Sequence, residues 1–92
     1  MSVRDYEGPS VRFDHELLVA RVMEVKRARG LTVVALAEEV GVALSTVTVY
    51  FREKPRRPVS KLSEMRANTV IRFLFWLHGS DMDIRDYLVE EK

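Results

Sequence analysis

The chain has 92 residues, 47% of them apolar, with only four glycines and three prolines, which predicts one domain and favours helices over an all-β or disordered chain. Cysteine is absent and the two histidines, His15 and His78, lie far apart, so we expect no disulfide, no metal site and no cofactor. The formal net charge of +1 does not by itself indicate a polyanionic partner.

The first twelve residues lack helical periodicity and contain Gly8-Pro9, which predicts a flexible N-terminal arm over residues 1–12. This arm carries Arg4 and Arg12. It has no apolar signal-peptide core, and the longest apolar run of the chain, residues 73–77, is too short to span a bilayer. We therefore expect a soluble, cytoplasmic protein.

Residues 13–92 are expected to form a single domain that begins with three helices. Apolar residues at spacings of three and four predict the first helix over about 13–29, with Gly30 as its C-cap. Thr32 is the expected N-cap of a second, short helix that stops at Gly41. A third short helix follows and ends before Pro55, so the pair spans about 32–53.

Two further helices are predicted in the C-terminal half. Ser60 is a plausible N-cap for a helix over about 60–78 with Gly79 as its stop. Ser80 and Asp83 resemble a capping box that would open a final helix over about 81–91. The expected fold class is therefore all-α, a compact bundle of about five helices.

Charge is unevenly distributed along this chain. Residues 52–72 contain seven basic and two acidic side chains, a balance of +5, whereas residues 81–92 contain two basic and five acidic ones, a balance of −3. Charge runs are often only solvated faces, but the positive segment directly follows the two short helices.

The two short helices have the layout of a helix-turn-helix: a turn that contains Gly41 and a small residue, Ala37, where the helices would cross closely. Apolar residues expected to hold the pair together are Leu36, Val40, Val42 and Val47. The segments Gly30-Leu31-Thr32, Leu36-Ala37-Glu38-Glu39-Val40-Gly41-Val42 and Ser45-Thr46-Val47 resemble the DNA-binding domain of Cro/CI-type phage repressors and the related XRE regulators. The resemblance covers about residues 22–54.

The resemblance implies a lambda-repressor-like bundle whose third helix enters the major groove of double-stranded DNA. It implies a sequence-specific transcriptional regulator, a phage- or prophage-type repressor that occupies an operator in the nucleoid of a bacterial host cell. The chain departs from the family pattern at Val33, Ala43, Leu44 and Phe51, where the family commonly has Gln, Ser, a long polar residue and Glu. These departures remove hydrogen-bonding groups, so direct readout of bases is expected to be weak.

Candidate base-reading residues are Leu44, Ser45, Thr46, Thr48 and Val49. Candidate phosphate contacts are Thr32, Arg52, Lys54, Arg56, Arg57 and Lys61, with Arg4 and Arg12 of the arm as additional DNA contacts. Because direct readout is weak, specificity would depend on DNA shape, on the arm or on the spacing of two copies.

The fourth predicted helix is apolar around most of its circumference, with Arg72 as the one charge between Val70 and Leu77. One stripe can cover the core, which leaves other apolar side chains without cover in so small a domain. We expect these side chains to form a homodimer interface, with the residues Ile71, Leu74, Phe75 and Trp76. The alternative is that the final helix covers them through Ile84, Tyr87, Leu88 and Val89.

Two other functional classes compete with a DNA-binding regulator. An enzyme is not expected and no catalytic residue is assigned, because no serine lies near a histidine and no phosphate-cradling glycine loop is present. The stronger alternative is a protein-interaction module, antitoxin-like or a phage accessory protein, with a degenerate helix-turn-helix. Ala43, Leu44 and Val49 favour that alternative, whereas the positive segment favours DNA.

Overall fold

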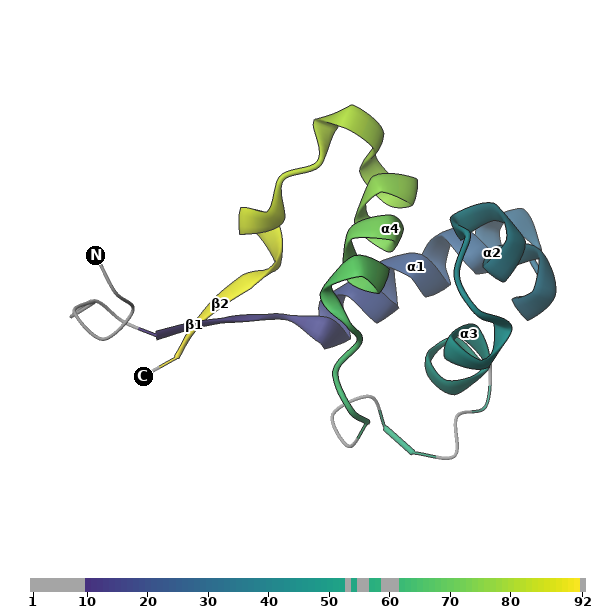
Figure 1. Ribbon diagram of the computed structural model, residues 1–92, viewed down its shortest axis with the longest axis horizontal. Coiled ribbons are helices and arrows are strands. Elements are labelled where there is room, and N and C mark those ends of the chain that lie inside the picture. The colour runs from purple at the N-terminus through teal and green to yellow at the C-terminus, as the bar shows by residue number, and fades with distance from the viewer. Residues whose placement is uncertain (1–9, 53, 55–56, 59–61, 92) are drawn as a thin grey trace.

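The computed structural model describes residues 10–52, 54, 57–58 and 62–91 (Figure 1). In chain order its elements are β1 (Ser10–Phe13), α1 (His15–Arg29), α2 (Val33–Val40), α3 (Leu44–Tyr50), α4 (Ala67–His78), the 3-10 helices η3 (Gly79–Asp81) and η4 (Ile84–Tyr87), and β2 (Leu88–Glu91). The fold is mostly helical, with four α-helices and one two-stranded sheet in the described residues.

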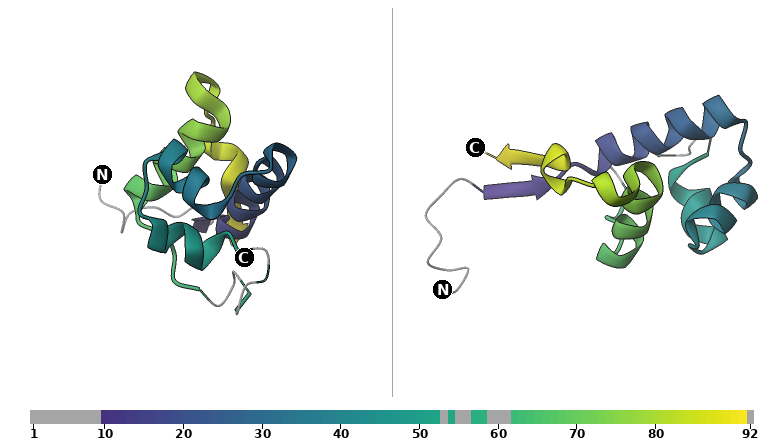
Figure 2. Two further views of the ribbon diagram at one scale, coloured as in Figure 1. Left: turned by 90° about the vertical axis from the view of Figure 1, so that its right-hand side faces the viewer. Right: turned by 90° about the horizontal axis from the view of Figure 1, so that it is seen from above.

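The four α-helices surround one hydrophobic core. Leu18 and Val22 of α1, Leu36 of α2 and Val47 of α3 are fully buried. The rings of Phe51 and Phe73 lie 4.8 Å apart, so the residue after α3 contacts the middle of α4. The helices cluster at one end of the molecule, and the sheet projects from them at the other (Figures 1 and 2).

The first two helices end where the sequence predicts. Gly30 and Gly41 adopt left-handed conformations, with φ of 65° and 82°, and close α1 and α2. Thr32 is the N-cap of α2, because its hydroxyl accepts a hydrogen bond from the Ala35 amide at 3.1 Å. Asp14 caps α1 in the same way through the Leu17 amide, at 3.0 Å. The predicted caps Gly30, Thr32 and Gly41 are confirmed, whereas the cap at Asp14 was not predicted.

The predicted helix over 60–78 begins later than expected, at Ala67. The residues directly before it make tertiary hydrogen bonds instead of helical ones: the Met65 amide donates to His15 Nε2 at 2.8 Å, and the Tyr50 hydroxyl donates to the Ser63 carbonyl. These bonds hold the segment in a non-helical conformation. The proposed cap Ser60 lies outside the described residues, and α3 likewise ends early, at Tyr50.

The mostly helical class is confirmed, but the prediction of a final helix over 81–91 is wrong. The segment forms η3, η4 and then β2, which pairs antiparallel with β1 so that Phe13 lies opposite Leu88. Asp83 caps only the short η4, through the Arg85 amide at 3.0 Å. The N-terminal arm is also shorter than expected, because residues 10–12 belong to β1.

Tyr87 explains why the chain leaves the helical conformation there. Its ring is fully buried and stacks on Phe13 at 5.7 Å. Its hydroxyl is hydrogen-bonded to His78 Nε2 at 2.6 Å, and its carbonyl accepts from the Asp14 amide at 2.6 Å. Burial of this one side chain therefore brings the two ends of the domain together as a β-ribbon.

None of the described helices is both long and apolar enough to cross a membrane.

Candidate functional site

The pair α2 and α3 is joined by a turn of residues 41–43. The Gly41 and Val42 amides both donate to the Ala37 carbonyl, at 2.9 and 3.1 Å, which closes the turn tightly. Ala37 is buried, as expected for a small residue at a close crossing. Val47 is fully buried and anchors α3 on the core, so the opposite side of this seven-residue helix faces outward.

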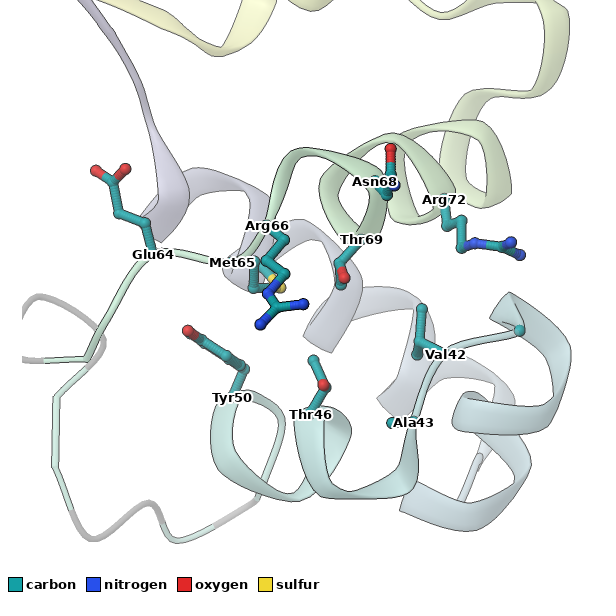
Figure 3. Close-up of a pocket in the computed structure, with 11 residues that line it drawn as sticks. Val42, Ala43, Thr46, Tyr50, Glu64, Met65, Arg66, Asn68, Thr69 and Arg72 are labelled. Atoms are coloured by element: carbon teal, nitrogen blue, oxygen red, sulfur yellow. The ribbon is translucent and has the colours of Figure 1, made fainter.

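The candidate base-reading residues divide between two sides of α3. Ser45 is exposed, and Leu44 and Val49 are 46% and 48% exposed on the outward side. Thr48 is half-buried, and its hydroxyl donates to the Leu44 carbonyl at 2.9 Å, which leaves it mainly an acceptor for other groups. Thr46 instead lines a groove toward α4 (Figure 3). The outward face therefore consists of Leu44, Ser45, Thr48 and Val49.

Two of the predicted phosphate contacts lie directly beside this face. Arg52 and Arg57 line a hollow of about 310 Å³ together with Thr48, Val49 and Leu62. Both arginines are exposed, and within the described part of the chain neither forms an ion pair. Two guanidinium groups are thus available to an external anion at the edge of α3.

The other predicted contacts are more scattered. Lys54 is exposed, and Thr32 is exposed at the start of α2. Arg12 is part of β1 and lines a hollow of about 270 Å³ that also includes Tyr50 at the end of α3. The predicted contacts Arg4, Arg56 and Lys61 lie outside the described residues.

A groove between α3 and α4 was not predicted from the sequence. Its volume is about 510 Å³, and Arg66 and Arg72 are among its lining residues. At its edge, burial and the nearby charge of Glu64 raise the pKa of Tyr50. The only sequence signal was the +5 balance of residues 52–72, which includes both arginines but does not show which surface they share.

The apolar surface of α4 is only partly the one expected. Ile71 and Phe75 are exposed, at 50% and 62%, but Leu74 is fully buried, so its assignment to an interface is wrong. The alternative, cover by a final helix, is also wrong, because that helix does not form and Ile84 is itself 47% exposed. Two apolar side chains of α4 therefore remain without cover in the described structure.

A groove of about 470 Å³ borders these side chains, and its walls come from α2 and α4. Its lining residues are Glu39, Val40, Ile71, Arg72, Phe75 and Trp76. Arg29 donates two hydrogen bonds to Glu39, at 2.8 and 3.0 Å, and Trp76 Nε1 donates a third at 3.3 Å. The hydrogen bonds from Arg29 lower the pKa of Glu39 most, and the hydrogen bond from Trp76 lowers it further. The Glu39 carboxylate is therefore ionised and held in place on the rim of the groove.

The chain matches no protein-family model, no curated protein and no solved structure. A functional assignment therefore depends on the geometry of the site and on the sequence pattern.

Proposed function

We propose that the protein binds double-stranded DNA through a helix-turn-helix formed by α2, the turn and α3, with α3 in the major groove. The observation that carries the proposal is the outward face of α3 with Arg52 and Arg57 beside it, in one hollow with Thr48 and Val49. A helix that reads DNA needs a protruding face for the bases and cations at its edge for the phosphates. The resemblance of this segment to Cro/CI-type repressors supports the same assignment.

The chemistry of the face limits how it would read bases. Ser45 can bond to several bases, and the exposed methyl groups of Leu44 and Val49 suit the thymine methyl. No bidentate base-reading side chain lies among Leu44, Ser45, Thr48 and Val49, so we propose that DNA shape supplies part of the specificity. Repression by operator occupancy, and a phage or prophage setting, rest on the sequence resemblance alone.

We further propose that two copies associate through α4. A two-fold interface needs a surface that complements itself, and here a protruding Phe75 stands beside the groove between α2 and α4. Within each copy Glu39 on the rim of that groove is paired with Arg29, so the surface left to complement itself is mainly the apolar one of Ile71, Phe75 and Trp76. Phe75 of each copy would then enter the groove of the other, and the pair would present two α3 helices to one DNA duplex.

DNA binding is tested by fluorescence anisotropy with the full chain and genomic fragments at several salt concentrations. We expect affinity to fall steeply with salt, by roughly 10³ between about 50 and 200 mM if six phosphate contacts form. The double variant Arg52→Gln/Arg57→Gln should weaken binding to all sequences and reduce the salt slope by about two. Arg85→Gln, at an exposed arginine outside the site, is the control for the loss of positive charge elsewhere on the surface. Equal affinities for the two variants would refute the proposed interface.

Association is tested by sedimentation velocity at tens of micromolar protein. We expect a dimer that Phe75→Glu converts to a monomer, because the change places a charge in the apolar groove. Val34→Glu, at an exposed apolar position of α2, is the control and should leave the dimer intact. A wild-type chain that stays monomeric would contradict the dimer.

A second candidate function is a protein-interaction module with a degenerate helix-turn-helix. The exposure of Leu44 and Val49, at 46% and 48%, is the observation that favours it, because half of the outward face of α3 is then apolar. In that case the Arg52→Gln/Arg57→Gln variant would retain partner binding, and Val49→Asp would abolish it.

A further inference from the structure

A polar groove lies between α3 and the first turns of α4, on the flank of α3 that does not carry the outward face. It has a volume of about 510 Å³ and opens beside the turn of residues 41–43. This volume lies within the range of roughly 300–1,000 Å³ that small-molecule sites occupy. Figure 3 shows Thr46 and Tyr50 rising from α3 on one wall, with Arg66 and Thr69 descending on the other.

Two arginines, Arg66 and Arg72, are among the lining residues of this groove. Among the described residues, neither Arg66 nor Arg72 forms an ion pair or a side-chain hydrogen bond. Glu64 belongs to the same lining, but its carboxylate points away from the groove in Figure 3. The groove therefore presents positive charge to its contents.

The side chains around Arg66 complete the set of donors that an oxyanion requires. Its guanidinium reaches into the groove between Tyr50 and the hydroxyl-bearing Thr46 and Thr69 (Figure 3). A planar guanidinium and neighbouring hydroxyl groups can together bond several oxygens of one phosphate. The Tyr50 hydroxyl is already used, since it donates to the Ser63 carbonyl, so it is not counted among these donors.

Arg72 supplies a second positive group at the other end of the groove. Its Nη1 lies 3.1 Å from the position that a Cβ on Gly41 would occupy, so the guanidinium lies against the α2–α3 turn. Val42 and the buried Met65 line the groove as well and are apolar. The site is thus elongated, with a cation at each end and apolar contacts in its wall.

We propose that this groove binds a small phosphate-bearing anion, with one phosphate held by Arg66, Thr46 and Thr69 and a second acidic group directed to Arg72. Because Thr46 is part of α3 and Arg72 contacts the turn before it, the bound anion would change how firmly α3 is held. This consequence rests on the proposed function: the anion would shift DNA affinity, and DNA would shift anion affinity by the same factor.

The site is tested first without DNA, by NMR titration of the full chain with inorganic phosphate and with pyrophosphate, at constant ionic strength kept with sodium chloride. We expect saturable shifts of the amides of Val42, Thr46 and Thr69, with tighter binding of pyrophosphate. Arg66→Gln should weaken pyrophosphate binding at least tenfold, whereas Arg85→Gln should leave it unchanged. Shifts that do not saturate, or pyrophosphate affinities that are equal in the two variants, would overturn the proposal.

A second titration separates a free anion from a phosphate of the DNA backbone. Pyrophosphate is added to the protein–DNA complex, and the apparent DNA affinity is followed to saturation. An effect that reaches a plateau supports a separate anion site coupled to α3. Strict competition without a plateau would assign the groove to a DNA phosphate and overturn the small-molecule site. A chain that binds pyrophosphate but no DNA would keep the anion site and refute the proposed function.

Discussion

The sharpest test of how α3 is held compares two valines of that helix. Val47 is fully buried, whereas Val49 is 48% exposed on the outward face. Truncation of either to alanine removes the same two methyl groups and gains the same helix propensity. The difference between Val47→Ala and Val49→Ala therefore isolates the burial of α3 on the core.

The magnitude follows from the buried atoms. Two buried carbon groups are worth about 1.6 kcal/mol at roughly 0.8 kcal/mol each, and a residual cavity adds to this, so Val47→Ala should cost about 2–3 kcal/mol. Val49→Ala should change the free energy of unfolding by no more than about 0.5 kcal/mol. We expect the reverse order for DNA affinity, since Val49 belongs to the proposed reading face and Val47 does not.

Urea unfolding followed by far-UV circular dichroism measures the first quantity, and anisotropy with folded protein measures the second. The two variants should differ by about 2 kcal/mol in the free energy of unfolding, with unchanged urea dependence. A difference below about 0.5 kcal/mol would show that α3 does not pack through Val47, and the orientation of the reading face would then be wrong.

Two further predictions concern polar contacts of the scaffold. His15→Phe leaves the Met65 amide without its acceptor and should lower the free energy of unfolding, measured in urea, by about 1–3 kcal/mol. His15→Gln keeps an acceptor and should lower it less. Equal losses in the two variants would contradict the hydrogen bond. The pKa of Glu39, followed by NMR, should lie below its ordinary value and return toward it in Arg29→Gln. Because the pKa of Glu39 is lowered in the folded state, its ion pair with Arg29 stabilises the fold at neutral pH, and this stabilisation is lost as the pH falls through the folded-state pKa. An unchanged pKa of Glu39 in Arg29→Gln would exclude Arg29 as the cause.

Features that depend on neighbouring residues could be predicted from the sequence. The cap at Thr32 and the stop at Gly41 follow from short-range hydrogen bonds and from the freedom of glycine at positive φ. The burial of Ala37 and Val47 follows from helical spacing in the same segment. These local signals define α2, the turn and α3, which make up most of the candidate site.

Features that depend on distant partners could not be predicted. A helix over 81–91 was as consistent with the local pattern as the strand that forms, and β2 exists because Tyr87 is buried against Phe13 from the opposite end of the chain. In the apolar run of α4, spacing alone does not show that Leu74 is buried and Phe75 exposed, because that depends on which side faces the other helices.

The candidate anion groove shows the same division. Charge can be counted along the chain, so the sequence predicts that positive residues follow α3. It is the fold that places Arg66 and Arg72 in one groove with Thr46, and Arg52 and Arg57 in another hollow with Val49. This separation arises because α4 begins only at Ala67, after tertiary hydrogen bonds to His15 and from Tyr50 have fixed the chain before it.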